Sequence, residues 1–220
     1  MGKVHILTEN QKFILEGINQ SDYLRNRFYF TGGTVLSEYY LQHRYSDDLD
    51  FFCKERFENK VIFALMSDWS KKYKFTFTSR FAEVVYRFDL KCKDESNFKV
   101  DFGYYPYSQI EKGKVIKGVL TDSLRDIATN KLITINQRTD VKDFVDLYFL
   151  LKNYYTIWDL FYSAEVKFKN MDLDVELIAM DMLKIEDFIL LPKMIKPLTL
   201  DQLKSFFREL AKKLGKKVVE

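Results

Sequence analysis

The chain has 220 residues, of which 47% are hydrophobic and 16% aromatic; this is enough for a buried core and excludes a disordered chain. Its 35 basic and 32 acidic side chains leave a net charge of +3, which permits a nucleic-acid partner without requiring one. No apolar run approaches the length of a membrane span, and the first residues lack the apolar core of a signal peptide. The two cysteines are isolated, which argues against a zinc site or disulfide framework and favours the cytoplasm.

The first 120 residues alternate between helical and strand-like patterns. Thr8 and Gln11 have the spacing of a capping box, which predicts a helix that buries Phe13, Ile14 and Ile18. Apolar residues at helical spacing predict further helices over residues 34–41 and 57–69. Short aromatic or alternating runs predict strands over residues 28–30, 48–53, 74–78, 81–91, 98–102 and, as an edge strand, 115–120.

The pattern changes near residue 120, after which almost every segment has helical periodicity. Residues suited to cap helices recur in this half: Ser123 with Asp126, Asp140, and Thr199 with Gln202. Near its end the chain is basic, with Lys212, Lys213, Lys216 and Lys217. We therefore predict an α+β fold, in which a mixed sheet flanked by helices over residues 1–120 is followed by a helical domain over residues 121–220.

Two glycines follow the first predicted strand. Gly32 and Gly33 lie between that strand and the helix expected from Thr34 onward. Glycine lets backbone N–H groups approach an anion closely, and the positive end of the following helix points to the same place. The junction is a candidate phosphate-binding turn. A plain tight turn is the alternative, which an isolated glycine pair would favour.

Two aspartates on the next predicted strand indicate a metal site. Asp48 and Asp50 are two residues apart, so their side chains point the same way, and their carboxylates could hold one or two Mg²⁺ ions. Asp47 is out of phase and is expected to face solvent. The alternative is the polar face of a half-exposed strand, but like charges side by side are costly without a cation. Asp101 would be a third carboxylate if its strand lies beside theirs; by itself it is typical of a surface strand residue.

A lysine lies in the middle of an apolar stripe in the helical half. Lys131 shares a helix face with Ile127, Ala128 and Ile135, and an unpaired buried ammonium is costly. It therefore either meets an anion, such as a triphosphate, or extends its tip to water. Asp143 lies at the border of the next helix's apolar face. It could orient Lys131 or contact the nucleotide, although a place in the first turn of a helix also suits an aspartate.

Two further candidate residues, which precede the metal-binding strand in the sequence, extend the predicted site. Arg44 could grip phosphates with two N–H groups, and Ser46 could hydrogen-bond a phosphate or cap the turn. A solvated arginine and a turn serine are the alternatives. His43 has no role that this chemistry needs, and Asp146 and Arg138 are weaker candidates.

Together these residues resemble a known superfamily. Gly32-Gly33-Thr34, followed by Asp48-Leu49-Asp50-Phe51, is similar in order and spacing to the nucleotidyltransferases typified by DNA polymerase beta. The run His43-Arg44-Tyr45-Ser46 resembles more closely the AbiEii/AbiGii branch, the toxins of type IV toxin–antitoxin and phage abortive-infection systems. The similarity covers about residues 28 to 151, including three segments of the helical half: residues 126–132, Arg138 and residues 142–148. A weaker resemblance continues in the C-terminal helices.

The resemblance implies a nucleotidyltransferase-like fold and Mg²⁺-dependent transfer of a nucleoside monophosphate from a nucleoside triphosphate (NTP) to an acceptor hydroxyl, with release of pyrophosphate. The helical domain is expected to complete the nucleotide cleft. The metal is assigned to Asp48, Asp50 and Asp101. The catalytic set is completed by Lys131 and Asp143. The nucleotide is assigned to Gly32, Gly33, Thr34, Arg44, Ser46 and Lys131.

The expected acceptor is RNA, above all the 3′ end of tRNA, because some members of the branch act there. A cognate antitoxin is an expected partner, and a membrane is not. Three alternatives stay open: transfer to a small molecule or a protein, a non-catalytic nucleotide-binding module, and a regulatory protein that works by contact alone.

Overall fold

The computed structural model describes residues 4–169, 171 and 173–219, without the side chains of residues 217–219, so the predicted tail lysine Lys217 lies outside the described side chains. The described chain divides into two compact units. The first unit runs up to Tyr40 and includes residues 46–108 and 112–123. The second contains residues 41–45, 109–111 and the chain from Leu124 onward. Two short segments of the first half therefore belong to the helical unit. The predicted single boundary near residue 120 does not anticipate this.

Each segment predicted as helix or strand contains regular structure, with shifted boundaries. The elements of the first unit are α1 (Glu9–Gln20), α2 (Asp22–Arg25), β1 (Phe28–Thr31), α3 (Gly32–Val35), the π-helix η1 (Leu36–Leu41), β2 (Leu49–Cys53), α4 (Asn59–Tyr73), β3 (Thr76–Ala82), β4 (Val85–Lys91), β5 (Asn97–Tyr104), β6 (Val115–Ile116) and β7 (Val119–Leu120). Those of the second unit are α5 (Leu124–Gln137), α6 (Val141–Asn153), α7 (Ile157–Lys167), α8 (Val175–Met182), the 3₁₀ helix η2 (Leu183–Asp187) and α9 (Leu200–Val219).

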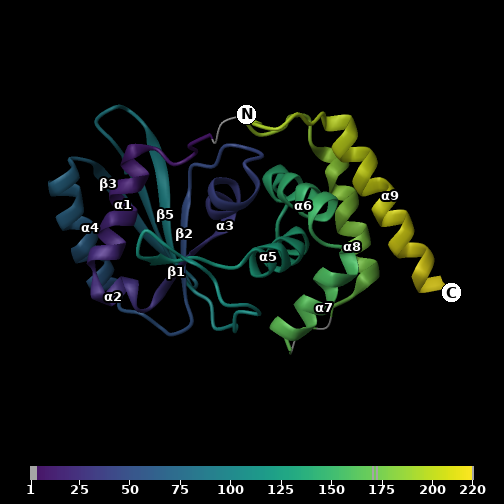
Figure 1. Ribbon diagram of the computed structural model, residues 1–220, viewed down its shortest axis with the longest axis horizontal. Coiled ribbons are helices and arrows are strands. Elements are labelled where there is room, and N and C mark those ends of the chain that lie inside the picture. The colour runs from purple at the N-terminus through teal and green to yellow at the C-terminus, as the bar shows by residue number, and fades with distance from the viewer. Residues whose placement is uncertain (1–3, 170, 172, 220) are drawn as a thin grey trace. The chain divides into compact units, whose positions relative to one another are not determined.

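Within the described residues, five strands of the first unit form one mixed sheet in the order β1-β2-β5-β4-β3. β2 and β5 are parallel, and the other neighbours are antiparallel. The predicted alternation of β2 is confirmed, because Leu49, Phe51 and Cys53 are buried while Asp50 is part-exposed. Helices α1 and α4 lie on one side of the sheet and α3 on the other (Figure 1). Asp50 therefore belongs to the sheet face that α1 and α4 leave uncovered.

Three local predictions are corrected. Residues 81–91 are not one strand, because the chain turns between β3 and β4 at Glu83, which has a φ of 55°; no glycine or asparagine signals this turn. Residues 115–120 form the separate two-stranded ribbon β6–β7 rather than an edge of the main sheet. Phe13 is 37% exposed, because its ring stacks on Tyr73 at 4.9 Å instead of entering the core. The capping box of Thr8 and Gln11 is confirmed.

The second unit is a helical bundle in which α5 packs against α6, α7 and α8, and α9 packs against α8 and α6. Asp140 caps α6 as predicted, and Thr199 and Gln202 exchange hydrogen bonds at the start of α9. The segment 43–45 joins this unit by backbone pairing, since the N–H of Tyr45 donates to Lys193 and the N–H of Ile195 donates to His43. In the described part of the chain, no helix is long and apolar enough to cross a membrane.

Candidate active site

One row of residues crosses the sheet on the face opposite to α1 and α4. Neighbouring strands place Thr31 beside Asp50, Asp50 beside Asp101, Asp101 beside Arg87, and Arg87 beside Arg80. Asp101 was expected to join the other carboxylates only if its strand lies beside theirs. It does, because β5 is the parallel neighbour of β2. Neighbouring strands are about 4.8 Å apart, so the two carboxylates lie side by side on one face.

The glycine turn lies directly against one of these carboxylates. Gly32 has a φ of +78°, and a Cβ added to it would lie 2.1 Å from Oδ2 of Asp50. Helix α3 begins at Gly32 rather than at Thr34, so the N–H groups of both glycines belong to the first turn, where no carbonyl of the helix can accept them. The turn thus brings backbone donors next to a carboxylate.

We expect Gly32→Ala to destabilise the protein by about 1–3 kcal/mol, because the alanine methyl group would collide with Asp50 and its backbone would be strained at positive φ. Urea unfolding followed by circular dichroism measures the loss. Gly215→Ala is the matched control: Gly215 lies within α9 with nothing within 4 Å of an added Cβ. Alanine there should raise stability by about 0.5–1 kcal/mol. Equal losses at the two positions would contradict the close approach of Asp50.

Thr34 links the turn to the start of β2. Its side chain is buried, and its hydroxyl donates to the backbone carbonyl of Asp48 and is hydrogen-bonded to the hydroxyl of Ser46 at 2.9 Å. A hydroxyl has one proton, and that of Thr34 is directed to a carbonyl oxygen in this arrangement; the assignment of Thr34 to the nucleotide stays a prediction. Asp48 is half-buried just ahead of β2, and Asp47 is exposed as expected.

Asp101 is held by an arginine from the next strand. Nε of Arg87 lies 2.8 Å from Oδ1 and 3.1 Å from Oδ2 of Asp101, and Nη2 lies 2.5 Å from Oδ2. Across the described residues, no three histidine, cysteine, aspartate or glutamate side chains are grouped so that they could hold a metal ion. The assignment of Asp48, Asp50 and Asp101 to a metal therefore stays a prediction.

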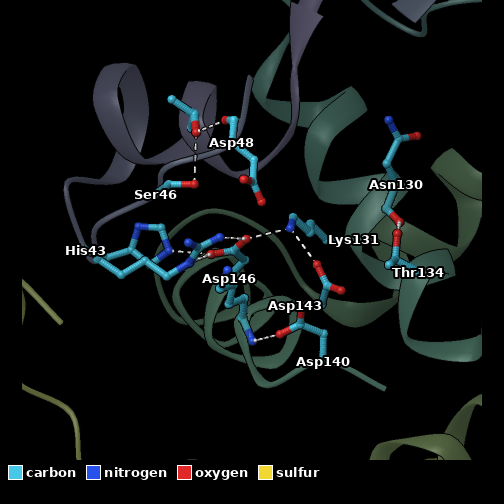
Figure 2. Close-up of polar contacts among 12 residues, drawn as sticks. His43, Ser46, Asp48, Asn130, Lys131, Thr134, Asp140, Asp143 and Asp146 are labelled. Carbon is cyan, nitrogen blue, oxygen red and sulfur yellow. Dashed lines mark hydrogen bonds and ion pairs between the residues drawn. The ribbon is translucent and has the colours of Figure 1, made fainter. Parts of the chain in front are cut away.

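In the second unit, Lys131 meets two carboxylates. Figure 2 shows its ammonium between Asp143 and Asp146, and its Nζ lies 2.6 Å from an oxygen of each. The Lys131 side chain is 9% exposed, Asp143 1% and Asp146 0%. Arg138 adds a further ion pair, 2.8 Å from Asp143. Lys131 was expected either to meet an anion or to extend its tip to water. It meets anions, and these are the carboxylates of Asp143 and Asp146.

Asp146 is the centre of this buried network. It accepts hydrogen bonds from Nε of Arg44 at 2.6 Å and from Nη2 at 2.8 Å. Its Oδ1 lies 2.7 Å from Nε2 of His43 (Figure 2). Arg44 is only 2% exposed, so it is not a solvated arginine, and its bidentate donors grip a carboxylate of this chain in place of the expected phosphate. Nη1 of Arg44 donates to the carbonyl of Tyr45.

The charges in the network stabilise one another. Burial by itself would raise the pKa of Asp146, but the positive charges of Arg44 and Lys131 and the hydrogen bonds from His43 and Arg44 hold it well below its ordinary value. Burial would likewise lower the pKa of Lys131, but Asp146 and Asp143 raise it. Burial lowers the pKa of His43 despite Asp146, so its ring is neutral at neutral pH. The network is therefore ionic except for the imidazole.

The sequence marks Asp146 as a weaker candidate and gives His43 no role, whereas the structure places both in the buried network. The available signal is the spacing of Asp143 and Asp146, three residues apart on a largely apolar helix, which places both carboxylates on one face. The partner Arg44 is about a hundred residues away, so no local pattern connects it to Asp146.

Comparison with solved structures identifies the fold. The structure resembles MenT4, a nucleotidyltransferase toxin of Mycobacterium tuberculosis H37Rv, with a TM-score of 0.59 and 15% identity over 94% of this chain and 82% of that one. It also resembles JHP933 of Helicobacter pylori, with a TM-score of 0.55 and 22% identity over 96% of each chain. The fold is that of a nucleotidyltransferase, as predicted.

Sequence comparison then gives the family. A family model described as "Nucleotidyl transferase AbiEii toxin, Type IV TA system" matches residues 14–218. An uncharacterized protein of Aquifex aeolicus (strain VF5) is 30% identical over 166 residues, which are 74% of this chain and 75% of that protein. The chain belongs to the AbiEii family of nucleotidyltransferase toxins, and it is a nucleotidyltransferase by class.

Proposed function

We propose that this toxin transfers a nucleoside monophosphate from an NTP to an RNA hydroxyl in a Mg²⁺-dependent reaction, with the 3′ end of tRNA as its acceptor. The observation that carries the proposal is the position of Asp50. It lies against Gly32 of the glycine turn and beside Asp101 on the neighbouring strand. Membership of the AbiEii family supports the reaction class. A type IV system also makes a cognate antitoxin the proposed partner.

The donor chemistry of the first unit fits Mg²⁺. Asp48, Asp50 and Asp101 offer carboxylate oxygens, the ligands that this ion prefers. Arg87 contacts both oxygens of Asp101, so metal binding at Asp101 competes with this ion pair. Mg²⁺ bound there would neutralise phosphate charge and polarise the α-phosphorus.

The chain's own groups have separate proposed tasks. The first-turn N–H groups of Gly32 and Gly33 bind phosphate oxygens, with the positive end of the helix behind them. Thr34 contributes its backbone N–H, while its hydroxyl holds Asp48 in place. Asp101 is the proposed acceptor of the proton that leaves the RNA hydroxyl.

In the second unit, Lys131 keeps its proposed nucleotide-binding role, and Asp143 is proposed to orient it. An ammonium has three donors, and the bonds with Asp143 and Asp146 use two of them, which leaves one for a phosphate oxygen. For Arg44 we now propose a positioning role, because its bonds with Asp146 fix the network that holds Lys131. Ser46 is proposed to position Thr34 in the same way.

Labelled NTPs test the proposal. We expect the protein, incubated with Mg²⁺ and each α-labelled NTP in turn, to transfer label to tRNA at its 3′ end, and EDTA to abolish the transfer. Absence of label on tRNA whose 3′-terminal diol was oxidised with periodate before the reaction would locate the acceptor at the 3′ end. Label on a protein or a small molecule instead would contradict the RNA acceptor. No label on any acceptor would favour a nucleotide-binding module.

A further inference from the structure

Arg87 occupies an unusual position for a cation beside a proposed metal site. It lies on β4, in register with Asp101 on β5, and Asp101 is in register with Asp50 on β2. Its guanidinium bonds both carboxylate oxygens of Asp101. The side chain of Arg87 is 34% exposed, whereas that of Asp101 is 13% exposed, so the pair lies at the surface of the sheet with the arginine on the accessible side.

The surrounding charges explain why the arginine stays there. Hydrogen bonds with Asp101 outweigh partial burial and raise the pKa of Arg87, and the charges of Asp101, Asp89 and Asp48 add to the effect. Without a cation, several carboxylates on one face would repel one another. Arg87 therefore supplies positive charge to the same carboxylates that are proposed to bind the metal.

We propose that Arg87 is an internal counter-ion of the acidic face, by which we mean the carboxylates of Asp48, Asp50 and Asp101. A divalent cation that binds these carboxylates must displace Arg87 from Asp101. This inference rests on the metal site of the proposed function. Arg87 is fixed in charge, because a guanidinium does not lose its proton in proteins, so the competition depends on cation concentration. The arginine thus sets the affinity for the metal and keeps the acidic face stable without it.

Manganese binding to the protein without nucleotide tests this role. Electron paramagnetic resonance measures free Mn²⁺ in a titration, so the readout does not depend on activity. We expect Arg87→Gln to tighten Mn²⁺ binding by about tenfold or more, because a positive charge next to the dication is removed. Arg87→Lys keeps the charge and should bind Mn²⁺ within about threefold of the wild type.

Two controls separate the possible results. Arg80→Gln removes the neighbouring, exposed arginine of the same row and should leave Mn²⁺ affinity unchanged. Asp50→Asn should abolish tight binding in both the wild type and the Arg87→Gln protein. Asp50-dependent binding that is equally strong with and without Arg87 would overturn the counter-ion role alone. If neither protein binds Mn²⁺ in an Asp50-dependent way, the metal site falls as well. Circular dichroism confirms that each variant is folded.

Discussion

Asparagine in place of Asp50 is expected to lower the rate of nucleotide transfer by about 10³-fold or more. The change removes one negative oxygen from the proposed metal ligands while it keeps the shape of the side chain, and metal stabilisation of the transition state contributes several kcal/mol. The measurement is the initial rate of label transfer under saturating Mg²⁺ and NTP. The fold should survive, because removing one of several neighbouring carboxylates relieves repulsion.

Asp47→Asn is the matched control for this prediction. Asp47 is three residues upstream, exposed, and bonded to Gln11 through its backbone carbonyl, so the same change there removes a charge without touching the proposed site. Its transfer rate should stay within about twofold of the wild type. An Asp50→Asn protein that is as active as the Asp47→Asn protein would refute the assignment of Asp50 to catalysis.

Asparagine in place of Asp146 is expected to reduce the free energy of unfolding by about 3–5 kcal/mol, because Arg44 would stay buried without its carboxylate partner and Lys131 would keep only Asp143. Urea unfolding measures the loss. Glu165→Gln removes a carboxylate that is exposed on α7 and should change stability by less than about 0.5 kcal/mol. A loss below about 1 kcal/mol in Asp146→Asn would show that the network contributes little to the fold.

The same variant should change the response to acid. The pKa of Asp146 is lower in the folded chain than in the unfolded chain, so the stability that this group contributes is present above its unfolded pKa of about 3.9 and is lost as the pH falls towards its folded pKa. The wild type should therefore lose stability steeply below about pH 4. Asp146→Asn should lose less over that range, since asparagine does not titrate.

The glycine turn and the orientation of Asp50 could be predicted from the sequence because their signals are local. Gly32 and Gly33 follow a strand, and the alternation of β2 separates Asp50 from Leu49 and Phe51; both patterns lie within a few residues. The sequence does not tell whether the strand of Asp101 lies beside that of Asp50, because strand order depends on packing over the whole sheet.

The residues of the buried network show the opposite case. Lys131 stood out because an ammonium in an apolar stripe needs a partner, and Asp143 was named as one. Arg44 was placed at the phosphates, because its position near Asp48 in the sequence suggested a common site. In the structure it belongs with the helical unit, where Asp146 accepts hydrogen bonds from its Nε and Nη2.

By itself, the sequence determined the class of fold, the glycine turn, the alternation that exposes Asp50, and the need of Lys131 for an anion. These follow from periodicity and from the cost of burying charge, which are properties of short segments. Only the tertiary structure decided which charges meet: Asp101 with Arg87 across two strands, and Arg44 with Asp146 across about a hundred residues. Such pairings depend on register and helix packing, and these are set by the whole core rather than by neighbours in the chain.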